Sequence, residues 1–234
     1  GERDRQLFNV EGMNVRQCGT VKDAQRGEGY RLVSREILLY LDLETGKPLK
    51  KWKNPWTGKE NDVIHVANDP VNGPPSFPIG RDGAPMKWRG NIMKGRVWTT
   101  GEAPLFYKNP LGGEYQDYVG GEYHAMEMLT MFTYEKDLLD ASKKESSDVT
   151  IAWARTSEWL PWMEMGDKMG MLIFTTVGKR LLKPEDLTAL MKEEIAANYP
   201  AYAAPPPLDD TRPNETSWTY FKKKIDEKKK EGGK

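Results

Sequence analysis

The chain opens with a polar stretch and then alternates between apolar and polar positions in short segments. Residues 33–41 are rich in β-branched, aromatic and apolar side chains, which is typical of a strand. The turn-forming residues 42–46 follow, so 48–53 is predicted to return as the second strand of a hairpin. Residues 61–68 predict a third strand, apolar enough to be buried on both faces. Residues 69–75 hold three prolines and a glycine, which no regular ladder accommodates.

The strand pattern continues through the middle of the chain. Further segments of strand-like composition are 84–93, 95–100, 104–107, 122–134, 148–155 and 170–177. Only 184–199 predicts a helix, because Pro184 suits a helix start, two acidic residues suit its first turn, and Pro200 ends it. Residues 205–207 are three prolines and predict an extended linker that lays the tail back across the domain.

Closely spaced strands without intervening helices exclude a parallel α/β sheet and predict a mainly β fold. We favour a closed antiparallel barrel of the lipocalin or calycin type, because closure removes the exposed edges of many strands. One C-terminal helix and an extended tail complete it. The expected organisation is an irregular N-terminal segment at 1–30, a single barrel domain at 31–221 and a charged, disordered tail at 222–234.

The charges of the chain balance. Lys plus Arg and Asp plus Glu both number 35 in 234 residues, so no global field attracts a polyanion and nucleic acid is not expected as a partner. No run of about 18 apolar residues occurs, so no integral membrane segment is expected. Cys18 is the only cysteine, which excludes an intrachain disulfide and a thiolate metal cluster. A homodimer is left open.

Aromatic residues and methionines are more frequent than the polar character of the chain suggests. Eight Trp, 10 Tyr and 11 Met accompany a mean hydropathy of −0.74. They build either a core of large side chains or an aromatic-lined cavity for a flat or apolar small molecule.

Several stretches, in their order and spacing, resemble the family catalogued as domain of unknown function 1838. The stretches are 43–46, 52–55, 57–58, 65–72, 152–155, 159–162 and 212–221. The resemblance covers the chain from residue 30 to residue 221 and implies relatives mainly in bacteria, some with removable export signals. The bacterial periplasm, after signal removal, and the bacterial cytoplasm both stay open. The resemblance implies no reaction.

His124 is the strongest candidate for acid–base chemistry. Glu122 lies two residues earlier in the same predicted strand, on the same face and about 7 Å away. That spacing lets a carboxylate orient an imidazole, as a general acid or base requires. The face continues with apolar side chains, so the pair belongs either to a ligand pocket or to a buried salt network. Tyr123, on the other face, is a candidate for substrate binding.

His65 is the second candidate catalytic residue. Alternation places its ring with Val63 and Ala67 on an apolar face, where a histidine is either a hydrogen-bonded core residue or a functional one. Asn68 opens the proline-rich loop and is a candidate binding residue at a cavity mouth. No His or Cys spacing of a metal site, no nucleotide-binding loop and no Gly-x-Ser-x-Gly elbow occurs, so neither a metal nor an organic cofactor is expected.

Three tryptophans surround an arginine late in the chain. Arg155 is a candidate anchor for a carboxylate or phenolate, and Trp153, Trp159 and Trp162 are candidates for stacking on its ring. The alternative is a core corner in which the arginine stacks on a tryptophan at the surface.

Two functions follow from these candidates. The first is an enzyme without an organic cofactor, of isomerase, lyase or hydratase type, acting on an apolar or aromatic molecule inside the barrel. In it His124 is the acid or base, Glu122 orients it, and Arg155 and Tyr220 polarise the substrate. The second is a lipocalin-like carrier of an apolar molecule. Trp218 and Tyr220 lie in a dense polar and aromatic stretch that is expected to dock on the barrel and contribute to binding.

Overall fold

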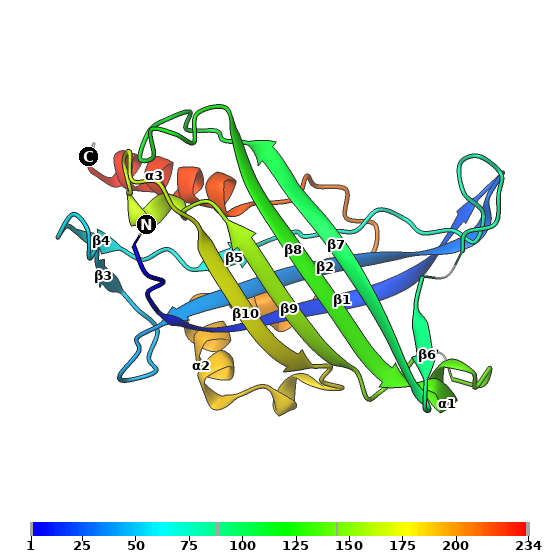
Figure 1. Cartoon of the computed structure of the whole chain (residues 1–234). Helices are drawn as coiled ribbons and strands as arrows, with labels where there is room; N and C mark the ends of the chain where they lie inside the picture. Colours follow the sequence, from blue (N-terminus) through cyan, green and yellow to red (C-terminus); the bar gives the residue numbers. More distant parts are fainter. Residues whose placement is uncertain (1, 88, 144, 233–234) are drawn as a thin grey trace. The chain divides into compact units, whose positions relative to one another are not determined.

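A computed structural model describes residues 2–87, 89–143 and 145–232 (Figure 1). The chain divides into two compact units. Unit 1 comprises Gly1–Met86, Leu160–Met165 and Thr188–Lys234, and unit 2 comprises Lys87–Trp159 and Gly166–Leu187. The single domain expected at 31–221 stays a prediction.

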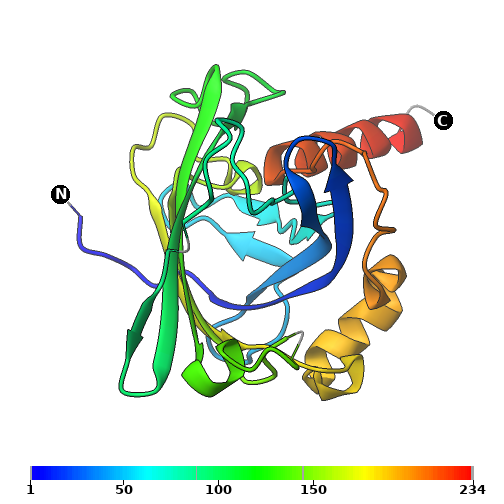
Figure 2. The same cartoon turned by 90° about the vertical axis from the view of Figure 1, so that its right-hand side faces the viewer.

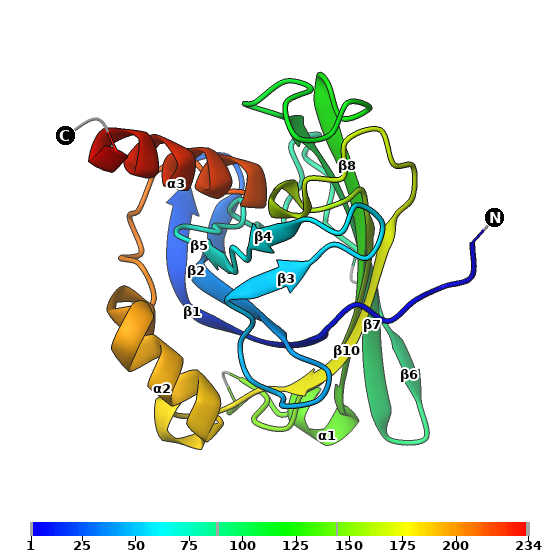
Figure 3. The ribbon, with the colours of Figure 1, turned by 90° about the vertical axis from the view of Figure 1, so that its left-hand side faces the viewer.

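Unit 1 contains two small antiparallel sheets. A three-stranded sheet has the order β1-β2-β5, and β3 pairs with β4 in a two-stranded sheet (Figure 3). The strands are β1 (Asn9–Asp23), β2 (Gly27–Leu41), β3 (Lys51–Lys53), β4 (Glu60–Asp62) and β5 (Val66–Asn68). The strand predicted at 61–68 is therefore two strands, because residues 63–65 leave the ladder and each half pairs with a different partner.

The N-terminal hairpin corrects one expectation. Residues 1–30 were predicted to be irregular, whereas β1 and β2 pair without a break from Asn9↔Leu41 to Asp23↔Gly27. Residue 1 lies outside the described residues. The turn forms because the Asp23 carboxylate accepts the backbone N–H groups of Gln25 and Arg26, and because Gly27 adopts φ +79°. β1 has one unpaired edge in the described residues and buries little of its surface, so it needs few apolar side chains.

An aromatic cluster forms part of the core of unit 1. The Trp162 ring centroid lies 5.2 Å from that of Tyr40 and 5.6 Å from that of Trp52, and Phe8 packs 4.9 Å from Tyr40. Tyr40, Trp52 and Trp162 are buried. Segments 8, 40–52 and 162 are thus held together by large apolar contacts, which supports the interpretation of many aromatic residues as core.

Two helices belong to unit 1, α2 (Ala189–Asn198) and α3 (Ser217–Gly232). The chain between them runs alongside the β1–β2 hairpin (Figure 2). Helix α2 begins later than predicted because the Thr188 hydroxyl caps it by accepting the Met191 N–H at 3.1 Å. Pro184–Asp186 forms a separate 3-10 turn.

Helix α3 corrects the prediction of a disordered tail at 222–234. Ion pairs at helical spacing join Lys222 to Asp226 at 2.5 Å and Lys224 to Glu227 at 2.9 Å. Trp218 and Phe221 are buried at its start. The charges that suggested disorder therefore pair with one another along the helix. Residues 233–234 lie outside the described residues.

Unit 2 is built on one five-stranded antiparallel sheet of order β10-β9-β8-β7-β6 (Figure 1). The strands are β6 (Asn91–Met93), β7 (Arg96–Lys108), β8 (Glu122–Tyr134), β9 (Thr150–Ser157) and β10 (Leu172–Lys179), and the short helix α1 (Glu135–Leu138) follows β8. The predicted strands 95–100 and 104–107 are one strand. Pro104 fits inside it because β6 pairs only with Arg96–Trp98. At the proline, β7 therefore pairs with β8 on one side and, among the described residues, with no strand on the other.

The prediction of a mainly β, antiparallel fold is confirmed. The pairings among the described residues make open sheets of three, five and two strands, so the closed lipocalin-like barrel is not confirmed. The prediction of a single helix is wrong, since the described chain has α1, α2 and α3.

Candidate functional site

The strand register of unit 2 separates the predicted site residues between two faces of one sheet. Glu127 pairs with Arg155 across β8 and β9, and Tyr107 pairs with Tyr123 across β7 and β8. Successive side chains alternate between faces, so these four lie on one side and His124 on the other. We call the first side the Arg155 face and the second the His124 face.

The Arg155 face carries an ion pair among aromatic rings. Arg155 Nη1 lies 3.3 Å from Glu127 Oε1, and the two side chains are only 14% and 20% exposed. The Tyr107 and Tyr123 ring centroids are 5.2 Å apart. Trp153 precedes Arg155 by two residues on β9 and therefore lies on the same face. Three of the predicted binding residues, Tyr123, Trp153 and Arg155, thus share one face.

Burial controls protonation in this cluster. It raises the pKa of Tyr107 and of Tyr123, while the nearby Arg155 guanidinium acts in the opposite direction. Both phenols are therefore neutral at physiological pH. A neutral phenol donates one hydrogen bond, and the Tyr123 hydroxyl donates to the Glu158 carbonyl at 3.0 Å.

The His124 face carries the predicted acid–base pair. His124 Nε2 lies 3.4 Å from Glu122 Oε2, and its Nδ1 lies 3.9 Å from Glu158 Oε1. Glu158 also accepts the backbone N–H of His124 at 2.9 Å, and Phe106 packs edge-to-face on the imidazole at 4.9 Å. The His124 side chain is 49% exposed, so its two carboxylate neighbours orient a ring that water reaches.

His65 lies outside the strands, between β4 and β5 in unit 1. Its Nδ1 accepts the Tyr40 backbone N–H at 3.1 Å, and its ring stacks 5.8 Å from that of Tyr40. Burial lowers the pKa of His65 below 6.5, so the ring is neutral at pH 7 and suited to accept this bond. The contact gives His65 a structural role, and a catalytic role stays a prediction.

The remaining predicted binding residues do not form one group. Trp159 belongs to unit 2, where its Nε1 donates to the Lys168 carbonyl at 2.9 Å, whereas Trp162 belongs to the core of unit 1. Asn68 donates to Glu36 Oε1 at 2.8 Å across the β2–β5 pair. In α3, Trp218 is buried, and Lys224 lies 5.4 Å from the centre of the half-buried ring of Tyr220.

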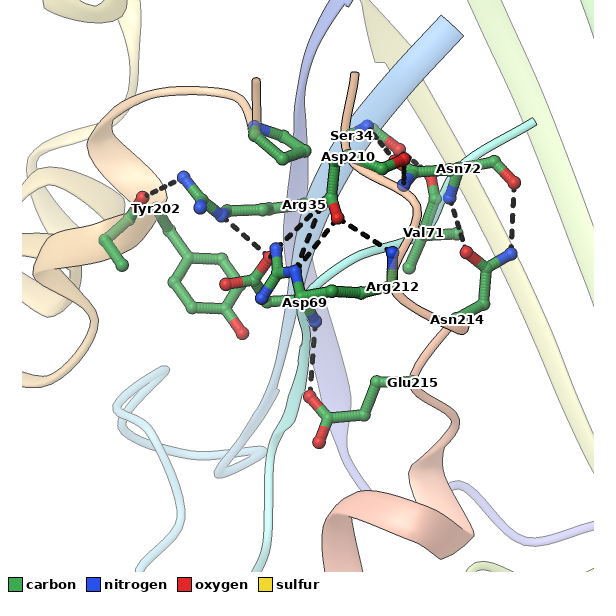
Figure 4. Close-up of polar contacts among 12 residues, drawn as sticks. Ser34, Arg35, Asp69, Val71, Asn72, Tyr202, Asp210, Arg212, Asn214 and Glu215 are labelled. Carbon is green, nitrogen blue, oxygen red and sulfur yellow. Dashed lines mark hydrogen bonds and ion pairs between the residues drawn. The ribbon is translucent and has the colours of Figure 1, made fainter. Parts of the chain in front are cut away.

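A second arginine-centred cluster occurs in unit 1 (Figure 4). Asp69 Oδ1 lies 2.9 Å from Arg35 Nε and 2.7 Å from Arg212 Nη2. Arg212 also forks onto Asp210, with its Nε and Nη2 3.0 and 2.8 Å from the two carboxylate oxygens. We call Arg35, Asp69, Asp210 and Arg212 the C-terminal clamp, since they tie the chain after α2 to β2 and to the loop after β5.

Amide side chains extend this clamp. The Asn72 backbone N–H donates to Asn214 Oδ1 at 2.8 Å, and Asn214 Nδ2 donates to the Asn72 carbonyl at 3.0 Å (Figure 4). The Asp69 N–H donates to Glu215 Oε2 at 3.2 Å. Asn72 Oδ1 accepts the N–H of the buried Ser34 on β2 at 3.1 Å. Backbone and side-chain groups of three chain segments therefore satisfy one another here.

Two acidic groups, Asp210 in the clamp and Glu215 beside it, have pKa values that are shifted in opposite directions. Hydrogen bonds from Arg212 lower the pKa of Asp210 to about 2, whereas burial raises the pKa of Glu215. Asp210 is therefore a fixed anion. Glu215 binds a proton more readily than an exposed glutamate.

Analysis of the sequence did not select the clamp as a site. Asp69 and Arg212 lie in two stretches that carry the family resemblance, 65–72 and 212–221, whereas Arg35 lies on β2 and Asp210 just before the second stretch. The available signal was the Asn-Asp-Pro-Val-Asn run at 68–72 and the Asp-Asp-Thr-Arg-Pro-Asn run at 209–214. A model for the family "Protein of unknown function (DUF1838)" matches residues 1–225.

The chain belongs to the DUF1838 family.

The DUF1838 match includes both arginine-centred clusters. No curated protein and no solved structure matches the chain. Within the described residues of this DUF1838 member, no helix has the length and apolar character that crossing a bilayer requires.

An open hollow of about 380 Å³ in unit 2 shares no residue with either cluster. It is lined by Gly95, Tyr134, Glu135, Lys136 and Leu139, around the end of β8 and the start of α1. None of the predicted site residues is among these five, so the hollow adds no support to them.

Proposed function

We propose that this DUF1838 protein binds an aromatic carboxylate or phenolate on the Arg155 face. The observation that carries the proposal is a largely buried guanidinium set among aromatic side chains on one sheet face. Arginine recognises planar anions through parallel N–H donors, and aromatic side chains stack on a flat ring. Tyr107, kept neutral by burial, supplies a further hydrogen-bonding group on the same face.

Glu127 sets the selectivity of this face. Its carboxylate lies 3.3 Å from Arg155, so it holds the guanidinium in place and also competes with an incoming anion. Because Glu127 already neutralises part of the arginine charge, a ligand gains binding free energy mainly from stacking. A delocalised anion on a large ring gains most in this way. Aromatic acids and phenols are therefore favoured over small inorganic anions.

Binding is favoured over catalysis by the arrangement of unit 2. The enzyme hypothesis needs His124 and Arg155 to act on one molecule, but their side chains alternate to opposite faces of the sheet. A small ligand on the Arg155 face would therefore not reach the imidazole–carboxylate pair that acid–base catalysis needs. The carrier alternative needs only the Arg155 face.

The test is saturation-transfer NMR and calorimetry with benzoate, 4-hydroxybenzoate and 2-naphthoate on the full chain. We expect saturable binding that is strongest for 2-naphthoate and falls at least about tenfold in Arg155→Met, a loss of roughly 1.4 kcal/mol. Arg81→Met, which changes an exposed arginine of unit 1, is the matched control and should bind like the wild type. Equal binding by the two variants, or no saturable binding of any of the three acids, would contradict the proposal.

A second candidate function is acid–base catalysis on the His124 face, of isomerase, lyase or hydratase type. The observation in its favour is the imidazole between the Glu122 and Glu158 carboxylates. The test is deuterium exchange at the activated C–H of 2-tetralone in D2O, followed by NMR. Catalysis predicts that the wild type accelerates exchange and that His124→Ala does not; equal rates would exclude it.

A closed lipocalin-like barrel is kept as part of the proposal. Strands of 15 and 13 residues in antiparallel pairs, such as β1–β2 and β7–β8, are the elements from which such barrels are built.

A further inference from the structure

The His124 face of the five-stranded sheet is unusually apolar for an exposed surface. Its large apolar side chains are between 37 and 78% exposed: Phe106, Met126, Met128, Phe132, Ile173 and Val177. They come from β7, β8 and β10, with Ala152 and Ala154 of β9 between them, and they occupy alternate positions that the register places on one side. Contiguous apolar patches of this kind mark interaction surfaces.

Most charges on this face lie at its two ends, and one carboxylate, Glu102, lies halfway along β7 opposite Met128. Glu122 and Glu158 lie where β8 begins and β9 ends, together with Lys108, the cross-strand partner of Glu122. At the opposite end lie Arg96, which stacks 3.9 Å from the centre of the Tyr134 ring, and Lys179. One end is therefore acidic overall and the other is basic, with the apolar side chains between them and Glu102 at the β7 side of the face.

A two-fold axis through the middle of the face makes this pattern self-complementary. Met128 lies near that middle, halfway along β8. Rotation by 180° about an axis through it brings the basic end of one copy onto the acidic end of the other and the apolar strip onto itself. Isologous contacts of this type are the commonest in homodimers.

The area of the face is sufficient for a stable dimer. β7 and β8 have 13 residues each, and β9 and β10 have 8 each. At about 3.3 Å per residue and about 4.8 Å between strands, they present about 660 Å² of flat surface. Two such faces give about 1,300 Å², within the range of about 1,200–2,000 Å² for specific interfaces.

We propose that the His124 face is the interface of a homodimer, formed by two copies of the sheet packed face to face about a two-fold axis. The interface leaves the Arg155 face of each copy on the side away from the partner. It therefore goes beyond the proposed binding function and does not depend on it.

The first test is sedimentation equilibrium of the full chain between 1 and 100 μM for Met128→Glu and Met169→Glu. The wild type is expected to be a dimer. Met128→Glu adds one carboxylate per copy at the centre of the interface, next to Glu102, and should weaken association by at least about 100-fold. Met169 is 77% exposed, in the connection before β10 and off the face, so Met169→Glu should remain dimeric. Circular dichroism checks that both variants keep their β structure.

The second test uses the divided charges. Arg96→Glu alone should weaken the dimer about tenfold, by roughly 1.4 kcal/mol, and the combination with Glu122→Arg should restore association. A monomeric wild type at 100 μM, equal effects of Met128→Glu and Met169→Glu, or no rescue by the double variant would overturn the proposal. So would binding of a monomer to neutral phosphatidylcholine vesicles that Met128→Glu abolishes, because a lipid surface would then be the occupant of the face.

Discussion

Two clusters of this protein are centred on arginine, and they differ in what holds the arginine in place. In the C-terminal clamp, Arg212 reaches an aspartate 143 residues away and joins segments that share no strand pairing. In the Arg155 cluster, the partner Glu127 is 28 residues away and is the cross-strand neighbour in a regular ladder. The clamp orders the chain, whereas the sheet orders the Arg155 cluster.

This difference separates the structural use of arginine in the clamp from the binding use proposed for Arg155. Arg35 donates to the carbonyls of Ala201 and Ala204 at 2.8 and 2.7 Å besides pairing with Asp69, so its loss would release a whole segment. Backbone ladders position Arg155 with or without its ion pair. Strand pairing, and not the head group, therefore fixes the backbone around Arg155, while the head group also interacts with Tyr107 and Tyr123.

The largest effect is expected when the clamp loses its shared anion. Asp69→Ala leaves Arg35 and Arg212 without their common carboxylate, and we expect the free energy of unfolding to fall by about 2–4 kcal/mol. Urea unfolding measures this loss. Asp209→Ala, which removes an exposed carboxylate one residue before the clamp residue Asp210, should change it by less than about 0.5 kcal/mol. Similar values for the two variants would mean that the clamp does not stabilise the fold.

The next effect concerns the Arg155 cluster, where two substitutions should change the affinity for an aromatic acid in opposite directions. Glu127→Gln removes the carboxylate that competes for Arg155, so the affinity for 2-naphthoate should rise about three- to tenfold. Arg155→Gln should lower the affinity by a similar or larger factor, with smaller changes in unfolding free energy than Asp69→Ala. Calorimetry with the same probe measures both. A fall in affinity in both variants would show that the ion pair acts as a unit and not as an anion site.

A smaller effect is expected from pH. Arg212 holds the pKa of Asp210 at about 2, below the ordinary 3.8, so the unfolded chain binds the proton more readily than the folded one. The contribution of Asp210 to stability is therefore complete above pH 4 and is lost as the pH falls through 2. Arg212 is half exposed, so we expect only about 1 kcal/mol.

This pH dependence is measured as the stability difference between wild type and Asp210→Asn from pH 6 to pH 2.5. The difference should shrink below pH 4, and an unchanged difference down to pH 2.5 would contradict the prediction. Glu215 has the opposite sign, because burial raises its pKa. Its contribution is complete below its ordinary pKa of 4.5 and is lost as the pH rises through its folded value, so Glu215→Gln should gain relative to wild type toward neutral pH.

The Arg155 cluster was easier to predict from the sequence than the clamp, because a regular sheet orders the first and long-range contacts order the second. Alternation along 122–134 predicted β8 with its bounds, and it also separated His124 from Tyr123 and Glu127. Local periodicity carries that information. Arg155 was selected as an anion anchor, but its pairing with Glu127 depends on the register of two strands, which periodicity leaves open.

The clamp and the terminal elements were missed because their stability is not local. β1 is polar and Gly-rich and becomes a strand only because β2 pairs along its full length. The charges of α3 suggested disorder, while Trp218 and Phe221, buried at its start, anchor it. Asp69 and Arg212 each lie in an irregular, proline-rich stretch, and nothing in either stretch alone identifies the other as partner.

The smallest effect is expected at His124, and it decides whether the two faces of unit 2 act together. The imidazole is half exposed and its carboxylate neighbours Glu122 and Glu158 are reached by water or by backbone N–H groups when it is removed. His124→Ala should therefore change the free energy of unfolding by less than about 0.5 kcal/mol. It should also leave the affinity of the Arg155 face for 2-naphthoate unchanged, because the sheet backbone separates the two side chains. Thermal unfolding and calorimetry on one preparation measure both quantities, with Thr130→Ala, on the same strand face, as the matched control. Loss of affinity in His124→Ala but not in Thr130→Ala would join the two faces into one site and restore the acid–base hypothesis for a bound aromatic ligand.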